Sequence, residues 1–291
     1  YDNIKNYRNN FKVSNFELIK SAIYFFLSKN EHIKTHYTHR GRTKIQVLKD
    51  EIQKKIKRKF RYSFINNNLE TKIDFHEKFI YFPLGVDEEK NLLINAPFYT
   101  NQLEVIRSIA KSLPVGYKLY VKENPAQVIR YWRSISDYKD IMNIPNVRLI
   151  HPSFPAEKIY EKCSLVITIS GTSGLDAAFY EKPAIIFSDL GYSILPSVSR
   201  LKNIGELSNL IRESLQKKVS SDDLDKYIGI LHDNSFDFNP MDFENKVNES
   251  FYYDGHYASV KISENKMKIF LEQNKSIIDN LASEFEKKMN Q

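Results

Sequence analysis

The chain has 291 residues, of which 42% are hydrophobic and 27% are charged. These values are ordinary for a globular protein, and the length suffices for one large domain or two smaller ones. No apolar run approaches the roughly 20 residues of a membrane-spanning helix. The single cysteine excludes an intramolecular disulfide framework and a cysteine-rich zinc site. The net charge of +7 favours anionic partners, namely nucleic acid, an acidic membrane surface or phosphorylated substrates.

Two further features bear on the cellular setting. Cys163 directly precedes an apolar strand pattern, so we expect a buried structural thiol in a reducing, cytoplasmic compartment. The chain opens on Tyr1 and not on Met, and it has no secretory signal pattern. We therefore expect a piece of a longer protein whose natural N-terminal part is missing.

Residues 1–76 are expected to form a basic, helical segment. Apolar residues recur at helical spacing over 16–29 and again over 44–60. Six of the eight residues in 54–61, KKIKRKFR, are basic. Two interpretations of this patch stay open: a solvated helix face, or a surface that contacts an anionic membrane or acceptor. No aromatic-rich nucleic-acid signature accompanies it, so we expect no nucleic-acid partner.

Residues 77–218 alternate short apolar runs with amphipathic helix patterns. The predicted strands are 78–84, 117–123, 146–151, 165–170 and 183–187. Such runs are typical of strands that helices cover on both faces. The alternation predicts an α/β fold, a Rossmann-like doubly wound parallel sheet with helical additions at both ends of the chain. Ligands bind such sheets outside the carboxyl ends of the strands, so candidate residues are sought there.

Residues 219–291 are expected to form a third part. The stretch 232–257 is polar and is expected to be irregular. An amphipathic pattern over 264–289 predicts one closing helix.

The turn after the strand 165–170 is the leading candidate for a binding site. It reads Ser170, Gly171, Thr172, Ser173, Gly174 and opens a helix. Glycines let the backbone approach a ligand, and free N–H groups at a helix start attract anions. The sequence therefore predicts a phosphate-binding turn with hydroxyls from Thr172 and Ser173. The alternative is an ordinary helix N-cap, since Ser and Thr are preferred there.

Three further residues at strand ends are candidate nucleotide ligands. Asp176, one turn into the same helix, is placed to reach a ribose hydroxyl. Lys122 and Asn124 follow the strand 117–123, where Lys122 can meet a phosphate and Asn124 can donate an amide hydrogen bond. A surface Asp near a helix start and a polar loop are the alternatives.

Candidate catalytic residues follow two other strands. Asp87, Glu88 and Glu89 come after the first strand, and we expect Asp87 or Glu89 to act as base or nucleophile toward a sugar. His151 follows the third strand and is a candidate for phosphate contact or proton transfer. Solvated carboxylates and a structural histidine are the alternatives.

No metal or bound cofactor is predicted. His36 and His39 stand three residues apart, but no third ligand with suitable spacing follows them. The glycine turn lacks the Gly-Lys-Ser/Thr of a Walker motif.

Four stretches, YFPLGVDEE, NQLEVIRSIAKSLPVGYKLYVKENP, NVRLIHPS and LVITISGTSGLDAAFYEKPAIIF, together resemble the capsule polysaccharide biosynthesis family. This family consists of bacterial glycosyltransferases of GT-B architecture. It includes transferases of 3-deoxy-manno-octulosonic acid (Kdo) that use CMP-Kdo. The resemblance covers about residues 79–200, which corresponds to the donor-binding second domain of such enzymes.

The resemblance implies roles for particular positions. The Gly171–Gly174 turn would hold the phosphate of the donor nucleotide, Asp176 stands where an acidic residue is usual, and Glu89 keeps the final acidic position of its motif. The chain departs from the family at Asn124, where His is common, and over 85–88. The acceptor-binding first domain has no evident counterpart, so the N-terminal helices and the tail form a reduced version of it, or the chain is a fragment.

The resemblance thus implies a glycosyltransferase of surface or capsular polysaccharide biosynthesis. It would transfer a Kdo-like sugar from a CMP-linked or other nucleotide-activated donor to a glycan or lipid-linked acceptor. We expect it in the cytoplasm, in peripheral contact with an anionic membrane at the inner face of the bacterial cytoplasmic membrane. Two alternatives stay open: a catalytically silent nucleotide-sugar or glycan-binding module, and a nucleotide-sugar epimerase.

Overall fold

The computed structural model describes residues 15–27, 43–87, 89–130, 133–251 and 262–290. The histidine pair of the N-terminal segment and Glu88 lie outside the described residues. In the described part, the chain divides into two compact units, one formed by 54–230 and the other by 15–53 with 231–290. The predicted boundaries after residues 76 and 218 remain predictions. No described helix is long and apolar enough to cross a lipid bilayer.

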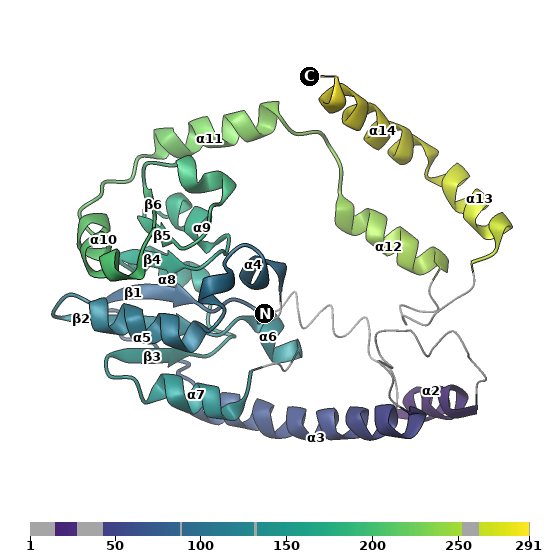
Figure 1. Ribbon diagram of the computed structural model, residues 1–291, viewed down its shortest axis with the longest axis horizontal. Coiled ribbons are helices and arrows are strands. Elements are labelled where there is room, and N and C mark those ends of the chain that lie inside the picture. The colour runs from purple at the N-terminus through teal and green to yellow at the C-terminus, as the bar shows by residue number, and fades with distance from the viewer. Residues whose placement is uncertain (1–14, 28–42, 88, 131–132, 252–261, 291) are drawn as a thin grey trace. The chain divides into compact units, whose positions relative to one another are not determined.

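The first unit is built on a six-stranded sheet in which all neighbouring strands are parallel. Its strands are β1 (Lys78–Pro83), β2 (Tyr117–Lys122), β3 (Val147–Ile150), β4 (Leu165–Thr168), β5 (Ala184–Ile186) and β6 (Val198–Arg200). They lie in the order β3-β2-β1-β4-β5-β6 (Figure 1). This order confirms the predicted Rossmann-like, doubly wound parallel sheet. It reverses between β1 and β4, and a crevice for ligands is expected at such a point.

The five predicted strands all occur, each one or two residues shorter than expected. The sixth strand, β6, was not predicted. It has three residues and pairs with β5 from Ala184–Val198 to Ile186–Arg200. Three residues are too few for a periodicity to be recognised in the sequence.

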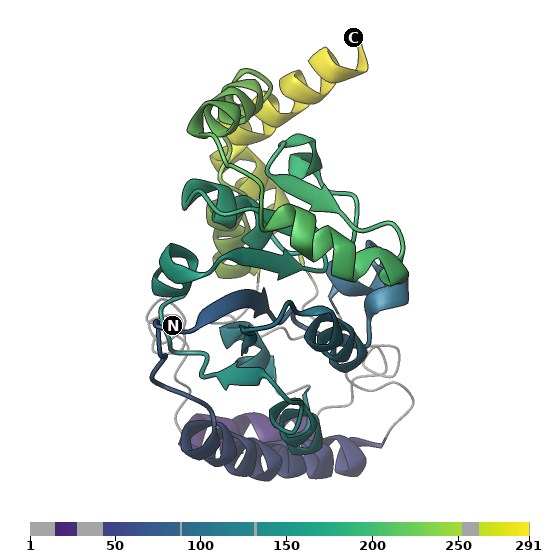
Figure 2. The same ribbon diagram turned by 90° about the vertical axis from the view of Figure 1, so that its left-hand side faces the viewer.

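Helices cover both faces of the sheet, as the two views of the ribbon show (Figure 1, Figure 2). The helices that belong to this unit or reach into it are α3 (Lys44–Asn68), α4 (Lys90–Leu93), α5 (Gln102–Ser112), α6 (Pro125–Arg130), α7 (Ile135–Met142), α8 (Ala156–Lys162), α9 (Ser173–Phe179), α10 (Leu207–Ser214) and α11 (Ser221–Asp233). Three single 3₁₀ turns, η2 (Pro97–Tyr99), η3 (Gly191–Ile194) and η4 (Ile204–Glu206), complete the described part of the unit.

The amphipathic pattern of the sequence over 126–142 predicts one helix, but the structure has two helices, α6 and α7, in this stretch. Ser134 and Asp137 form a capping box, in which the Ser134 side chain accepts from the Asp137 N–H and the Asp137 side chain accepts from the Ser134 N–H. This arrangement starts α7 afresh. It also leaves Arg133 in the connection between α6 and α7.

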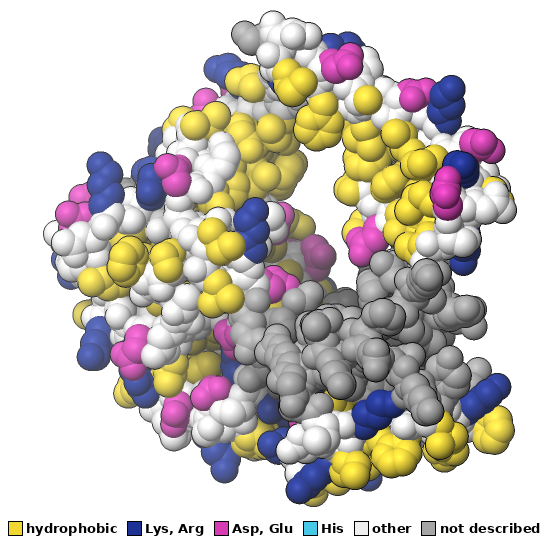
Figure 3. Space-filling model, turned by 45° about the vertical axis from the view of Figure 1, so that its right-hand side comes forward, with side chains coloured by type: hydrophobic (Ala, Val, Ile, Leu, Met, Phe, Trp, Pro, Cys, Tyr) yellow, Lys and Arg dark blue, Asp and Glu magenta, His cyan; other side chains and the backbone are white. Residues whose placement is uncertain are grey.

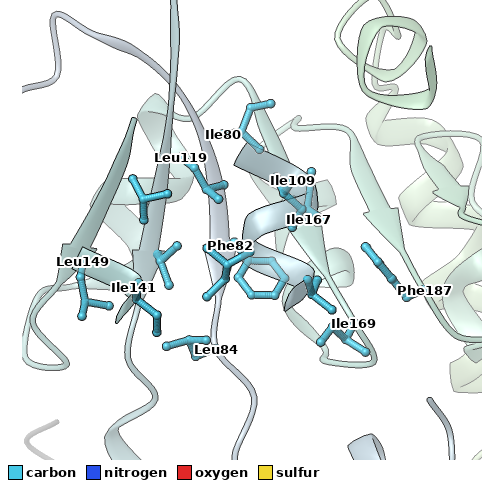
Figure 4. Packing of buried hydrophobic residues seen from close by; sticks show 14 of the residues in the cluster. Ile80, Phe82, Leu84, Ile109, Leu119, Ile141, Leu149, Ile167, Ile169 and Phe187 are labelled. Carbon is cyan, nitrogen blue, oxygen red and sulfur yellow. The ribbon is translucent and has the colours of Figure 1, made fainter. Parts of the chain in front are cut away.

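The hydrophobic core has two parts, one on each face of the sheet. Ile80, Phe82 and Leu119 from the strands pack with residues of α5 and α7 on one face, and Figure 4 shows part of this cluster. Phe79, Tyr81 and Tyr120 join the second cluster, with residues of α8 and α9. Successive strand residues point to opposite faces, so alternation along the strands feeds both clusters.

Cys163 belongs to the second cluster and is 2% exposed. Burial raises the pKa of its thiol to about 12. The expected buried thiol is therefore confirmed.

The second unit is helical in its described part. It contains α2 (Asn15–Leu27), the first turns of α3, α12 (Pro240–Phe251), α13 (Glu264–Gln273) and α14 (Lys275–Met289). The stretch expected to be irregular contains α12, whose start is capped by Asn239 Oδ1. The expected single closing helix is interrupted at Asn274, which ends α13 with φ −110° and ψ 15°. Both predictions were wrong: Asn239 caps a helix inside the polar stretch, and Asn274 interrupts a helix inside a continuous amphipathic pattern.

Candidate functional site

A pocket of about 200 Å³ opens at the carboxyl ends of β1 and β4, where the strand order reverses. Its lining consists of Pro83, Leu84, Gly85, Val86, Glu89, Asn91, Leu92, Asn124 and residues 168–173. The volume is below the roughly 300–1,000 Å³ of most ligand pockets, so a ligand as large as a nucleotide sugar would fit it only in part. No Lys or Arg belongs to the lining, as far as the structure describes the chain. An anion here would bind to backbone N–H groups, hydroxyls and amides.

The turn between β4 and α9 forms one wall of this pocket. Ser170 Oγ donates a hydrogen bond to the Asn91 carbonyl, which joins the turn to α4. The Gly171 N–H donates to Thr168 Oγ1 over 3.2 Å. The Tyr192 hydroxyl donates to the Gly171 carbonyl. These three hydrogen bonds fix the first half of the turn.

The two glycines of the turn are required by close packing. A Cβ on Gly171 would lie 2.9 Å from Thr168 Oγ1, and a Cβ on Gly174 would lie 2.8 Å from the Tyr192 hydroxyl and 3.2 Å from Ile186 Cγ2. Neither glycine has a positive φ. Gly174 is buried below the turn and does not line the pocket. Its presence is therefore explained by the contact with Tyr192 without a ligand.

Thr172 stands at the N-cap of α9 but does not act as a cap. Its side chain makes no capping hydrogen bond, and its backbone is already helical with φ −70° and ψ −10°. The Thr172 carbonyl accepts from the N–H groups of Leu175 and Asp176 over 2.8 and 3.0 Å. The alternative of an ordinary N-cap therefore does not describe this residue. Thr172 and Ser173 both line the pocket.

Two of the candidate nucleotide ligands lie away from the pocket lining. Asp176 accepts a hydrogen bond from the Tyr160 hydroxyl over 3.3 Å, and burial raises its pKa while Tyr160 lowers it. Lys122 shares the face of β2 with Tyr120, in the second cluster, and is 7% exposed. Burial lowers the pKa of Lys122, and the carboxylates of Glu123 and Glu157 oppose this shift. Neither Asp176 nor Lys122 lines the pocket.

Asn124, the third candidate ligand after β2, does line the pocket. Its Oδ1 accepts from the Ala126 N–H over 2.9 Å at the start of α6. Its own N–H donates to Glu123 Oε1 over 2.7 Å. Both the side chain and the backbone N–H of Asn124 are therefore fixed by hydrogen bonds.

Asp87 lies within a network of hydrogen bonds. Its Oδ1 accepts from Gln102 Nε2 over 2.6 Å, and its Oδ2 accepts from Gln127 Nε2 over 3.0 Å. Arg133 Nη2 donates to both oxygens, over 3.2 and 3.1 Å. Gln102 also bonds both backbone groups of Gly85. Both carboxylate oxygens of Asp87 are therefore engaged by side chains of the protein.

Glu123 and Arg133 extend the same network and were missed by the sequence reasoning. Glu123 is fully buried, and its Oε2 accepts from Arg133 Nη1 over 3.2 Å. Burial raises the pKa of Glu123, and the Arg133 guanidinium opposes this shift. Gln102, Gln127 and Arg133 are 5%, 1% and 4% exposed. Such polar residues at buried positions require partners, but the sequence does not show which partners they have.

His151 holds the edge of the sheet and does not line the pocket. Its Nδ1 accepts from the Ser153 N–H over 3.1 Å, so its Nε2–H faces Asn66 Oδ1, 3.0 Å away on α3. The His151 N–H also donates to the Glu70 carbonyl over 2.9 Å. Burial and the nearby Lys122 lower the pKa of the His151 ring. A neutral ring that joins α3 to the end of β3 fits the structural alternative.

Glu89 is the predicted catalytic residue that lines the pocket. It is the N-cap residue of α4, and its carbonyl accepts from the Leu92 and Leu93 N–H groups over 3.0 Å each. Within the described residues, no group of three or more His, Cys, Asp or Glu side chains could hold a metal ion. The pocket therefore combines one carboxylate, two amides and a turn rich in hydroxyls.

A family model described as capsule polysaccharide biosynthesis protein matches residues 4–219. The chain belongs to this family. The predicted family is thereby confirmed, and the match extends from the motifs of the sheet into the N-terminal helices. The match to the capsule polysaccharide biosynthesis family thus includes the residues that line the pocket.

Two solved structures similar to the chain are the UDP-GlcNAc 2-epimerase of Methanocaldococcus jannaschii and KpsC of Thermosulfurimonas dismutans, a beta Kdo 2,7 transferase. The epimerase is 16% identical with a TM-score of 0.39, over 59% of this chain and 48% of the epimerase. KpsC is 13% identical with a TM-score of 0.34, over 52% of this chain and 49% of KpsC. The chain thus spans less than half the length of either protein. No curated relative matches the sequence.

Proposed function

We propose that the chain is the donor-binding part of a GT-B type glycosyltransferase that acts in capsule polysaccharide biosynthesis. The observation that carries this proposal is the pocket at the reversal of the strand order, in a chain that belongs to the family. The donor is a nucleotide sugar, Kdo-like and CMP-linked in the simplest case, and the acceptor is a glycan or a lipid-linked glycan. The reaction takes place in the cytoplasm, at the inner face of the bacterial cytoplasmic membrane.

The turn of Ser170, Gly171, Thr172 and Ser173 binds the phosphate of the donor in this proposal. Negative charge develops on the departing nucleotide when its bond to the anomeric carbon breaks. Hydrogen-bond donors that are held in place before the reaction stabilise such charge without reorganisation. The three hydrogen bonds that hold the turn support this role. Asn124, on the facing strand end, contributes an amide.

Glu89 acts as the general base. It takes the proton of the acceptor hydroxyl while the hydroxyl oxygen bonds to the anomeric carbon and the nucleotide phosphate leaves. Its position in the pocket lining supports this role, and the hydrogen-bond network around Asp87 argues against that neighbour. Attack by Glu89 on the sugar itself is the alternative, and the configuration of the product distinguishes the two.

The test is donor binding followed by turnover. The melting temperature of the full chain is measured with CMP-, UDP-, GDP- and ADP-sugars, and any stabilising donor is then incubated with and without acceptor. We expect one nucleotide class to raise the melting temperature. The affinity for that nucleotide should be roughly 10-fold or more weaker in Thr172→Ala and in Ser173→Ala. The absence of a response to any nucleotide contradicts the proposal.

The same experiment separates the other functions. Stabilisation without hydrolysis or transfer indicates a silent binding module. Product formed from UDP-GlcNAc alone, without acceptor, indicates an epimerase.

We further propose that the basic segment 54–61 of α3 contacts an anionic membrane surface. Six of its eight residues are Lys or Arg, and two apolar side chains, Ile56 and Phe60, are 53% and 68% exposed one turn apart. Figure 3 shows apolar and basic side chains next to one another along its lower edge, where α3 runs. Exposed apolar side chains flanked by cations are typical of helices that lie in a lipid interface.

A further inference from the structure

We propose that Arg133 is a positioning residue for the pocket, which holds the loop after β1 to the loop after β2. The Arg133 side chain does not itself line the pocket. It acts through the backbone and the carboxylates of these two loops. The inference deepens the proposed function, since the walls that Arg133 fixes are those of the proposed donor pocket.

The contacts of Arg133 reach both loops at once. Nη2 donates to the Gly85 carbonyl over 3.2 Å and to the Asp87 carboxylate over 3.1 and 3.2 Å. Nη1 donates to Glu123 Oε2 over 3.2 Å. The planar guanidinium presents several donors in a fixed fork, which suits it to bridge three acceptors. A lysine ammonium is a single point of charge and cannot span them in the same way.

Each loop that Arg133 holds supplies a wall of the pocket. Gly85 belongs to the lining on the β1 side, and Asn124 belongs to it on the β2 side. Glu123 receives Arg133 on one oxygen and the Asn124 N–H on the other, over 2.7 Å. The connection therefore runs from Gly85 through Arg133 and Glu123 to Asn124. Asp87 stands two residues before Glu89. The hydrogen bonds from Arg133 to Asp87 therefore also fix the chain close to the proposed base.

Burial makes this connection rigid and costly to break. Arg133 is 4% exposed and Glu123 is fully buried, so water is poorly placed to replace either partner. Breaking a buried ion pair by removal of one partner leaves an uncompensated charge. The groups that face Glu123 are Arg133, Asp87, Tyr138 and the Asn124 N–H, and the Lys122 ammonium also interacts with it electrostatically. Of the two cations, the guanidinium is the one that is hydrogen-bonded to Glu123.

The test compares local hydrogen exchange in the full chain and in two variants, Arg133→Lys and Arg133→Met. We expect Arg133→Lys to fold and to exchange backbone amides roughly 10- to 100-fold faster at 85–87 and 123–127, with β4 and β5 unchanged. Arg200→Lys serves as the matched control, because Arg200 pairs with Asp189 over 2.7 Å at an exposed position. We expect wild-type exchange at both loops in that control.

Arg133→Met keeps the test decisive if loss of the charge weakens the whole fold. Its melting temperature should recover toward that of the wild type as the pH is lowered, because a protonated Glu123 no longer needs a cation. A deficit that is independent of pH would mean that Arg133 only fills space, and this overturns the proposal. Unchanged exchange in Arg133→Lys, or faster exchange spread evenly over the sheet, overturns it as well.

Donor affinity provides the readout for positioning. If Arg133→Lys keeps the melting temperature of the wild type, we expect its affinity for the nucleotide that stabilises the wild type to be about 10-fold weaker. If no nucleotide binds the wild type, the proposed function fails while the exchange experiment still decides whether Arg133 holds the two loops. The two failures are therefore distinguishable.

Discussion

Two carboxylates that stand two residues apart have different surroundings. Asp87 receives hydrogen bonds from Gln102, Gln127 and Arg133, whereas Glu89 lines the pocket at the start of α4. The sequence predicted both positions, because an apolar run shows where a strand ends. It did not predict their different roles, because the partners of Asp87 are 15, 40 and 46 residues away along the chain.

Substitution separates these two roles. Asp87→Asn should lower the free energy of unfolding by about 2 kcal/mol, because it leaves the buried Arg133 with a weaker partner. Glu89→Gln should change stability much less and lower turnover by roughly 10²- to 10⁴-fold. Urea denaturation and a transfer assay measure the two effects. A loss of turnover in Asp87→Asn together with a loss of stability in Glu89→Gln would contradict this assignment of roles.

The glycines of the first unit also differ in what they do. Gly174→Ala should lower the free energy of unfolding by roughly 1–3 kcal/mol, because its Cβ would meet the Tyr192 ring and hydroxyl within 3 Å. Gly229 is the matched control, since it lies inside α11 with nothing within 4 Å of an added Cβ. Gly229→Ala should raise the free energy of unfolding by about 0.5–1 kcal/mol. Thermal or urea denaturation measures both, and equal effects would refute this explanation of Gly174.

Elements of the sheet were predictable where burial dictates composition. Strands covered on both faces are apolar throughout, so β1 to β5 were recognisable as short runs. Helix ends were not, because they depend on single hydrogen bonds. Ser134 begins α7 and Asn274 ends α13, each within a longer amphipathic pattern that had predicted a single helix.

The link between α3 and β3 depends on a neutral histidine. Burial and then Lys122 lower the pKa of His151 below its ordinary value, so the unfolded chain takes up a proton more readily than the folded one. The contribution of His151 to stability is therefore present above about pH 6.5 and is lost as the pH falls below it. We expect a smaller fall in melting temperature between about pH 7.5 and about pH 5.5 in His151→Gln than in the wild type.

The exposed His232 of α11 provides the control for this pH dependence. His232→Gln should keep the full fall in melting temperature. If His151→Gln keeps it as well, protonation of His151 is not coupled to unfolding.

For the whole molecule, the order of the motifs carried more information than any one of them. A glycine turn after a strand allows several interpretations, but four motifs in sequence predicted the family that the match over residues 4–219 confirms. The net charge of +7 is close to the six cations of segment 54–61, so the rest of the chain is nearly balanced in charge. The sequence left open whether these cations are merely solvated.

Binding to vesicles tests the membrane proposal. The triple variant Lys55, Lys57 and Lys59→Gln should bind phosphatidylcholine vesicles that contain phosphatidylglycerol about 100-fold more weakly than the wild type, at roughly 1 kcal/mol for each lysine. Added salt should weaken the binding of the wild type. Cosedimentation at several salt concentrations measures both.

Three exposed lysines elsewhere provide the matched control for the vesicle experiment. The control variant carries Gln at Lys111, Lys158 and Lys162. It should bind nearly as well as the wild type. An equal loss in the control, equal binding to vesicles without phosphatidylglycerol, or a preference for RNA or DNA over vesicles would contradict the proposal.

The reaction of the single buried thiol with a labelling reagent measures how readily the protein opens. Cys163 lies directly before β4, at the centre of the sheet, and it is the only residue in the chain that a thiol reagent can label. At 2% exposure it reacts only when the packing around it opens. The labelling rate therefore reports the opening of this part of the sheet. A nucleotide that binds at the carboxyl ends of β1 and β4 should slow the labelling of Cys163, whichever nucleotide it is.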